Sequence, residues 1–284
     1  MLLTYDSCRY DTMAAARTPV LDAYARPRLA LSPATYTLPA HHSFFAGILP
    51  QVVEDVPLYN RFSAQLMALS EPLAIVRPTV LSVASPSNIP AGLRDRGYQT
   101  VGAGAMEWFR QESLSVGFER FRFTGTDADA QIAFVLDGLD RGRPFFLFVN
   151  FGETHAPFTY AGKPAPDLFP MIAAHMTWPP RQRGPVGPAS PHFAHQVEAV
   201  EFLDSRLPAL FDALPGETIV VLCGDHGECM GEDGYWGHAI NHPKVFEVPM
   251  AIFRIDGRDI EIPPGPRTPL RDRVYLMRRR AVRG

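Results

Sequence analysis

The feature of this sequence that most constrains the fold is a set of short apolar runs, each of about the length of a β-strand. Residues 2–5, 144–151 and 218–224 form such runs. A strand that is apolar throughout is buried on both faces, which is typical of parallel sheets covered by helices. Residues between the runs, such as 127–139, have apolar positions at helical intervals. The sequence therefore predicts an α/β fold with a mostly parallel central sheet and helices on both faces.

The remaining pattern continues this alternation along the whole chain. We expect further helices at 18–25, 41–48 and 89–96, a strand at 98–103, and an amphipathic helix at 193–214 with a kink at Pro208. No linker divides the chain, so we predict a single domain over residues 1–284. Residues 160–191 are rich in proline and glycine and are expected to form a long loop or lid, and residues 263–284 a basic tail.

Composition limits the classes of function. The 284 residues are 46% hydrophobic, enough for one large core, but no apolar run is long enough to cross a bilayer. A formal net charge of -3 gives no reason to expect a nucleic acid or an anionic membrane as partner. The three cysteines, Cys8, Cys223 and Cys229, lack the spacing of a disulfide framework, and the amino terminus has no signal-peptide pattern. We therefore expect a cytoplasmic protein, unless an upstream leader has been lost. The oligomeric state is left open.

Two of the apolar runs end in side chains that can bind a metal ion. Asp225 and His226 follow the run at 218–224, and Asp6 follows the run at 2–5. Open α/β sheets build their sites at the carboxyl ends of strands, where carboxylate and imidazole groups together suit divalent metals. Aspartate and glycine also occur at strand ends for backbone reasons alone. The two clusters predict a metal site only if their strands are neighbours in the sheet.

A hydroxyl group near a helix start is a third feature. Thr37 precedes Leu38-Pro39 and a helix that we expect to begin near Ala40. Backbone N–H groups and the helix dipole at such a position favour a developing negative charge. In the alternative interpretation, Thr37 only caps the helix, and His41 and His42 form a surface pair.

Several short motifs join these features in a fixed order. They are Asp-Ser-x-Arg-x-Asp at 6–11, Thr-Pro-x-Leu-Asp at 18–22, a segment at 37–50 ending in Gly-x-x-Pro, Gly97-Tyr98, Gly117-Phe118, His-x-Pro at 155–157, Asp-His-Gly-Glu at 225–228, Gly237-His238 and Val248-Pro249. This set resembles the metal-dependent alkaline phosphatase and sulfatase superfamily over nearly the whole chain. The resemblance implies an alkaline-phosphatase-like fold with a reduced C-terminal part.

The resemblance also implies a nucleophile and a metal site. Thr37 falls where sulfatases have the cysteine or serine of Cys-x-Pro-Ser-Arg, which matures to formylglycine. The Thr-Leu-Pro-Ala-His found here is similar to the Thr-x-Pro-x-His of nucleotide pyrophosphatases and phosphodiesterases, which argues against a sulfatase. The implied metal ligands are Asp6, Thr37, Asp225 and His226. Zinc or manganese suits this set, and calcium fits less well because Ser7 stands where many sulfatases have a second aspartate.

Further residues take roles from the same resemblance. The implied catalytic residues are Thr37, His155 and His238. The implied substrate-binding residues are Arg9, His41, His155 and His238. A structural ion pair between Arg9 and Asp11 is an equal alternative for Arg9. A second metal ion would use Glu153, His155 and His238, but we favour one ion.

The function implied is a metal-dependent hydrolase or transferase that acts on a phosphate ester through a covalent phospho-threonine. The ester is a phosphodiester, a phosphomonoester or a phosphonate ester, and the expected partner is a small-molecule substrate. Two alternatives remain open. One is a sulfatase-type sulfuric ester hydrolase, and the other is a non-catalytic scaffold that has kept the fold.

Overall fold

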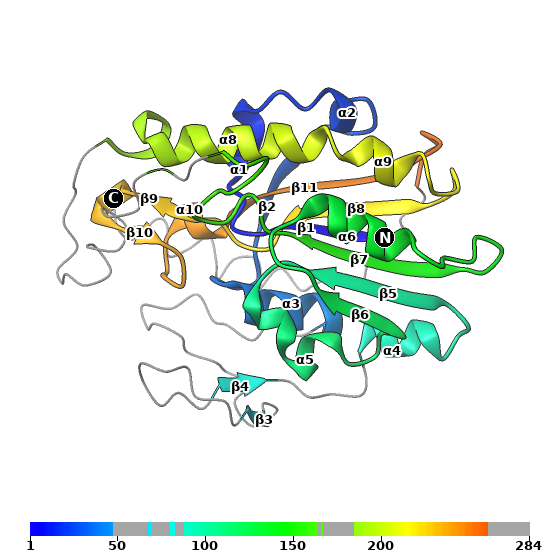
Figure 1. Ribbon diagram of the computed structural model, residues 1–284. Coiled ribbons are helices and arrows are strands. Elements are labelled where there is room, and N and C mark those ends of the chain that lie inside the picture. Colours follow the sequence, from blue (N-terminus) through cyan, green and yellow to red (C-terminus); the bar gives the residue numbers. More distant parts are fainter. Residues whose placement is uncertain (48–66, 70–79, 83–87, 164–165, 167–184, 261–284) are drawn as a thin grey trace, which may run out of the picture.

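A central sheet of seven strands organises the protein (Figure 1). The structure is a computed structural model that describes residues 1–47, 67–69, 80–82, 88–163, 166 and 185–260. The strand order is β2-β11-β8-β1-β7-β5-β6. These strands are β1 (Leu2–Tyr5), β2 (Arg28–Leu31), β5 (Gln99–Gly104), β6 (Arg120–Phe123), β7 (Phe145–Phe151), β8 (Ile219–Gly224) and β11 (Glu247–Arg254). Most of the predicted loop at 160–191 and all of the predicted tail at 263–284 lie outside the described residues.

The pairing within this sheet is mostly parallel, as predicted. Strand β1 pairs in parallel with both β7 and β8, and β5 pairs in parallel with β7 and β6. Strand β11 is antiparallel to both of its neighbours, β8 and β2. Two small antiparallel sheets pair β3 (Met67–Leu69) with β4 (Val80–Ser82) and β9 (Cys229–Met230) with β10 (Trp236–Gly237).

Helices cover both faces of the sheet (Figure 1). One face carries α1 (Tyr10–Ala15), α2 (Pro19–Asp22), α6 (Ala128–Leu136), α8 (Pro191–Asp204) and α9 (Leu207–Phe211). The other carries α3 (Thr37–Ala46), α4 (Ile89–Arg94) and α5 (Glu112–Ser115). The short α10 (Pro243–Phe246) leads into β11, and 3-10 turns span Glu107–Arg110, Gly187–Ala189 and Glu232–Gly234. None of the described helices has the length and hydrophobicity that crossing a bilayer requires.

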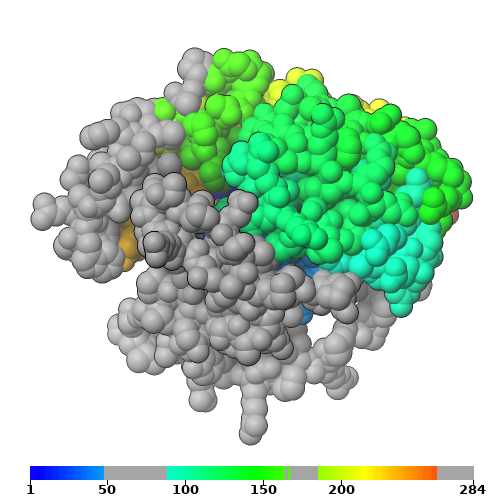
Figure 2. All heavy atoms as spheres, turned by 60° about the horizontal axis from the view of Figure 1, so that its bottom comes forward, coloured from blue at the N-terminus to red at the C-terminus, as the bar shows by residue number. Residues whose placement is uncertain are grey.

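Strand β7 shows why its run of residues is apolar throughout. Leu147, Val149 and Phe151 pack into the core beneath α8 and α9, while Phe148 packs with Phe45 of α3 on the opposite face. Each such side chain stabilises the fold by about 1.5–3 kcal/mol when it leaves water. In the space-filling view of Figure 2, the cyan to green part of the chain forms one continuous block on one side of the molecule.

Some boundaries differ from the predicted ones. The helix predicted at 193–214 is broken at Ser205-Arg206, and Pro208 lies in the first turn of α9, where a missing N–H costs nothing. The helix expected from Ala40 already begins at Thr37. Strands β2 and β11 were not predicted. In β11, Pro249 removes a ladder donor from a strand with neighbours on both sides, which is rare and conceals the strand in the sequence.

Candidate metal centre and active site

The candidate site lies where two neighbouring strands end. Tyr5, the last residue of β1, pairs with Gly224, the last residue of β8. Asp6 and Asp225 are the next residues of the two strands, so they leave the sheet side by side. Helix α3 begins at Thr37 close to Asp6, because the Thr37 hydroxyl lies within 3.4 Å of both Asp6 carboxyl oxygens. The condition set by the sequence, that the two strands be neighbours, is met.

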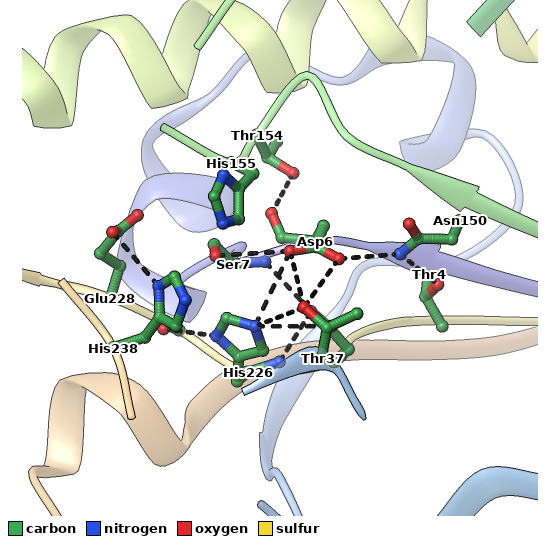
Figure 3. A network of polar contacts seen from close by, with 12 residues as sticks. Thr4, Asp6, Ser7, Thr37, Asn150, Thr154, His155, His226, Glu228 and His238 are labelled. Atoms are coloured by element: carbon green, nitrogen blue, oxygen red, sulfur yellow. Dashed lines mark hydrogen bonds and ion pairs between the residues drawn. The ribbon is translucent and has the colours of Figure 1, made fainter. Parts of the chain in front are cut away.

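Four buried side chains converge at this point (Figure 3). Thr37 Oγ1 is 3.3 Å from Asp6 Oδ2 and 3.4 Å from His226 Nε2. His226 Nε2 is 3.7 Å from Asp6 Oδ1 and 3.6 Å from Asp225 Oδ2. Asp6, Asp225 and His226 each offer one ligand atom within 4.8 Å of the other two. These are the four residues that the resemblance assigns to the metal.

The carboxylates fit a divalent cation. Asp225 Oδ1 accepts hydrogen bonds from the backbone N–H groups of Ser7, at 3.0 Å, and His226, at 2.9 Å. The other oxygen, Oδ2, is buried without a hydrogen-bond partner among the described residues. Burial, followed by the charge of Asp6, raises the pKa of Asp225 well above its usual value, and burial raises the pKa of Asp6. Two carboxyls that face each other out of water are stabilised as anions by a cation between them.

His226 presents the nitrogen that a metal needs. Its Nδ1 lies 2.9 Å from the carbonyl oxygen of Gly227, which can only accept, so Nδ1 carries the hydrogen. Nε2 therefore directs a lone pair at Asp6, Asp225 and Thr37. Burial, together with the charge of His238, lowers the pKa of His226 well below its usual value and keeps the ring neutral. A neutral histidine held by a backbone carbonyl is the usual metal-binding form.

Glycine at position 227 is a packing requirement. A Cβ atom there would collide with the carbonyl oxygen of Lys244, and the Gly227 N–H donates to Val245 at 2.7 Å. The loop that carries Asp225 and His226 is thus fixed against α10. The Asp-His-Gly pattern in the sequence therefore reflects both the candidate ligands and the close approach of two segments of the chain.

A chain of hydrogen bonds joins Asp6 to the backbone of Thr37, and Figure 3 shows its first part, from Asp6 through Asn150 to Thr4. Asn150 Nδ2 donates to Asp6 Oδ2 at 3.1 Å and to Thr4 Oγ1 at 3.0 Å. Thr4 Oγ1 lies 3.1 Å from His41 Nε2, and His41 Nδ1 lies 2.8 Å from the Thr37 carbonyl oxygen. Sequence reasoning missed Thr4 and Asn150, although a lone polar residue inside an apolar strand is a signal that could have found them.

His41 therefore supports Thr37 through the backbone carbonyl of that residue. Burial lowers the pKa of His41 to about 3, so the ring is neutral, donates through Nδ1 and accepts the Thr4 hydroxyl at Nε2. The rings of Phe109 and Phe148 enclose it edge-on at 4.8 and 5.5 Å. This geometry gives His41 a structural role, and its contact with substrate stays a prediction. The alternative of a surface pair is wrong, because His41 and His42 are both buried.

Arg9 also has a structural role. Its guanidinium is buried and makes two hydrogen bonds to Asp11, at 2.8 and 2.7 Å, and an ion pair with Glu232 at 2.7 Å. A further bond reaches the carbonyl oxygen of Glu228 at 3.3 Å. These partners tie the loop after β1 to the loop after His226, and they support the structural alternative for Arg9. Its contact with substrate stays a prediction.

Two more histidines flank the cluster. The ring of His238 lies 4.6 Å from that of His226 and 5.2 Å from that of His155. Both His155 and His238 are partly exposed, unlike the four converging residues. Burial alone lowers the pKa of His238, but the Glu228 carboxylate, 3.4 Å from Nδ1, outweighs it and raises that pKa. Glu228 belongs to a recognised motif, yet no role was predicted for it.

Glu153, a candidate ligand for a second ion, is directed elsewhere. Its Oε1 accepts from the Ala128 N–H at 2.8 Å, at the start of α6. Among the described residues, one group of side chains has the spacing of a metal site, and it consists of Asp6, Asp225 and His226. The number of ions stays a prediction.

Comparison with known proteins identifies the family. The sequence model of the sulfatase family matches residues 18–258. The chain therefore belongs to the sulfatase family, within the alkaline phosphatase and sulfatase superfamily, and the resemblance drawn from the motifs is confirmed. It is a sulfatase-family hydrolase or transferase, of a kind that binds a divalent metal ion. No curated protein matches the chain by sequence.

Solved structures share the fold at low identity. The putative sulfatase yidJ from Bacteroides fragilis has a TM-score of 0.57 and 16% identity, covering 90% of this chain and 68% of its own. The lipoteichoic acid synthase LtaP from Listeria monocytogenes has a TM-score of 0.54 and 13% identity, and the match covers 94% of this chain and 66% of that one. The Streptococcus pyogenes phosphoglycerol transferase GacH, in complex with sn-glycerol-1-phosphate, has a TM-score of 0.54 and 13% identity. The match covers 92% of this chain and 69% of that one. This chain thus spans about two thirds of the length of each, and the predicted alkaline-phosphatase-like fold is confirmed.

Proposed function

We propose that this protein is a metal-dependent hydrolase or transferase of phosphate esters with Thr37 as its nucleophile. The observation that carries the proposal is the place of the Thr37 hydroxyl, at the first residue of α3 and within 3.4 Å of both Asp6 and His226. A threonine cannot mature to the formylglycine of sulfatases. A hydroxyl in this position supports direct attack on phosphorus.

One zinc or manganese ion, held by Asp6, Thr37, Asp225 and His226, is part of the proposal. Four of the separations between these ligand atoms, those of Thr37 and His226 to their neighbours, run from 3.3 to 3.7 Å. The ligand atoms of Asp6, Asp225 and His226 all lie within 4.8 Å of one another. A tetrahedron with metal–ligand bonds of about 2.0–2.2 Å has edges of roughly 3.3–3.6 Å. Calcium prefers more oxygen ligands at longer distances, so this compact oxygen and nitrogen set favours zinc.

The proposed reaction proceeds in two displacements. When bound, the ion lowers the pKa of the Thr37 hydroxyl and offsets negative charge on the phosphoryl group. Thr37 Oγ1, which has lost its proton to solvent and reacts as the alkoxide, then bonds to phosphorus while the bond to the leaving oxygen breaks, and that oxygen takes a proton from His238 or His155. In the second step, water or an acceptor alcohol returns a proton to the histidine, bonds to phosphorus and displaces Thr37. Hydrolase and transferase differ only in this acceptor.

Glu228 supports the assignment of His238 as the proton donor. Its carboxylate is buried and close to His238 Nδ1, so it favours the protonated ring and fixes its orientation. His155 bonds to the carbonyl oxygen of Ala156 through Nδ1, which leaves Nε2 as the nitrogen available to substrate. Both rings are proposed to contact the ester.

Two alternative functions that the sequence left open remain. A sulfuric ester hydrolase is the closer one, since the family and the fold include sulfatases. A scaffold that has lost catalysis is less well supported, because all four converging residues are present and one carboxylate oxygen is left for a cation. We also propose, from the sequence, one catalytic domain over residues 1–284 and a cytoplasmic location.

Side-by-side assays test the function. Bis(p-nitrophenyl) phosphate, p-nitrophenyl phosphate and p-nitrophenyl sulfate are offered to the zinc-loaded and manganese-loaded protein. We expect turnover of a phosphate ester and, on rapid acid quenching, a phosphoryl adduct on Thr37 detected by peptide mass spectrometry. Thr37→Ala should abolish both while leaving zinc content unchanged, because three protein ligands remain. Sulfate-only turnover, or equal turnover by Thr37→Ala, would overturn the proposal.

A further inference from the structure

Helix α8 contributes none of the proposed catalytic or metal-binding residues, yet one of its side chains reaches the site. Gln196 lies in the middle of α8, and its side chain is fully buried. Its amide points towards the carboxyl ends of β1 and β7, the two strands that lead to Asp6 and His155. A buried amide must satisfy two N–H donors and a carbonyl acceptor, so its partners show what it holds together.

All the polar capacity of Gln196 is used on the loops after β1 and β7 and on the first turn of α1. Nε2 donates to the carbonyl oxygen of Ser7 at 2.9 Å and to that of Thr154 at 2.8 Å. Oε1 accepts from the Arg9 N–H at 3.2 Å and from the Thr12 hydroxyl at 2.6 Å. If the amide were flipped, its NH₂ group would face the Arg9 N–H and its oxygen would face the two carbonyl oxygens. These contacts therefore fix the orientation of the amide.

The two carbonyls belong to residues next to the reacting groups. Ser7 follows Asp6 with a positive φ of 58°, and its N–H holds Asp225 Oδ1. Thr154 precedes His155, and its hydroxyl donates to the Asp6 carbonyl oxygen at 2.7 Å (Figure 3). One amide of α8 therefore fixes the peptide beside the metal ligands and the peptide beside the proposed leaving-group histidine.

We propose that Gln196 is a positioning residue that sets the separation between the metal-binding loop after β1 and the His155 loop after β7. Glutamine suits this task because it alone combines two donors, an acceptor and this length. Asparagine is one carbon shorter, glutamate lacks the donors that meet the two carbonyls, and methionine has the length without the bonds. The catalytic part of this inference rests on the proposed function, whereas the structural part does not.

Substitution at Gln196 tests the proposal with three measurements. The variants are Gln196→Met, which removes all four bonds, and Gln196→Glu, which keeps the acceptor oxygen and loses the donors. Hydrogen exchange by mass spectrometry should rise together in segments 6–12 and 152–156. Zinc affinity should fall by about 10-fold, the smaller of the losses seen when groups that support metal ligands are removed. At saturating zinc, kcat for a phosphate ester should fall by about 100-fold, with little change in KM, because misplacement mainly affects the transition state.

A matched control on the same helix separates positioning from general stability. Asp204 of α8 is also buried and accepts from the N–H groups of Val20 and Leu21, far from the site along the helix. Asp204→Asn should loosen segment 18–22 and lower Tm, but leave zinc affinity and kcat within about twofold of wild type, the scatter of such measurements.

Each outcome decides the matter. If a folded Gln196 variant exchanges faster in only one loop, or keeps wild-type zinc affinity, the positioning role is wrong. The Glu variant serves this purpose if the Met variant fails to fold. If the wild-type protein turns over no ester, the proposed function fails instead, and the exchange and zinc measurements still judge the role of Gln196.

Discussion

Glu153 allows a quantitative prediction about the loop that carries His155. Its Oε1 accepts from the Ala128 N–H, while Oε2 is buried without a hydrogen-bond partner among the described residues. Burial raises the pKa of Glu153 from 4.5 to about 7, and hydrogen bonds from backbone N–H groups oppose this only in part. The folded protein therefore binds this proton more tightly than the unfolded chain does. Its contribution is favourable below pH 4.5 and is lost as the pH rises towards 7.

The size of the effect follows from the two pKa values. Their gap corresponds to about 3 kcal/mol of unfolding free energy at pH values above both. Between pH 5 and pH 8, about 2.5 kcal/mol of this is lost, since the unfolded carboxyl is already partly ionised at pH 5. Glu153→Gln cannot ionise, so this loss should disappear. Any constant cost of the new amide cancels when one protein is compared with itself at the two pH values.

Urea unfolding at pH 5 and pH 8, with a chelator present throughout, measures this difference. The free energy of unfolding of wild type should fall more between the two pH values than that of Glu153→Gln, by about 2.5 kcal/mol. The exposed carboxylate of Glu119 provides the control, because Glu119→Gln should follow wild type. Parallel profiles for wild type and Glu153→Gln would refute the reasoning. They would mean that the carboxyl is solvated, or held by another cation.

Three further predictions concern the site and its supports. Zinc at 100 times its Kd should stabilise the protein by about 2.7 kcal/mol, which raises Tm by roughly 5–10 °C in a thermal shift assay; a shift that persists in Asp225→Asn would contradict the site. His41→Phe keeps the ring packing but loses the bond to the Thr37 carbonyl, so stability should fall by about 1–3 kcal/mol and kcat should fall with it. Unchanged kcat in that variant would speak against a supporting role. Arg9→Lys loses the paired bonds to Asp11, so the free energy of unfolding should fall by about 3 kcal/mol while KM stays unchanged. A raised KM at unchanged stability would indicate instead that Arg9 binds substrate.

The predictions that the sequence supported best were those that depend on local pattern. The fold class followed from runs such as 144–151, because a strand covered on both faces has no polar side to show. The residues Asp6, Thr37, Asp225 and His226 were found because each stands at the end of a strand or the start of a helix. Their motif order gave the family before any contact was known.

Errors arose where a residue's surroundings, and not its neighbours in sequence, set its role. Strand β11 was not predicted, yet it lies between β2 and β8 because its residues pair on both sides despite Pro249. For Arg9 the sequence left substrate binding and an ion pair with Asp11 as equal alternatives, and for His41 it left substrate binding beside a surface pair. Burial and their partners support a structural role for both.

The sequence by itself determined the α/β class, the family and the chemical kinds of group available for catalysis, because periodicity and motif order are written along the chain. Only the tertiary structure decided which groups meet. Strands β1 and β8 are separated by more than two hundred residues, and their register places Asp6 beside Asp225. The same holds for Gln196, whose helical position is ordinary in sequence. Its role depends on four hydrogen bonds to residues of the loops after β1 and β7 and of α1, which no local pattern encodes.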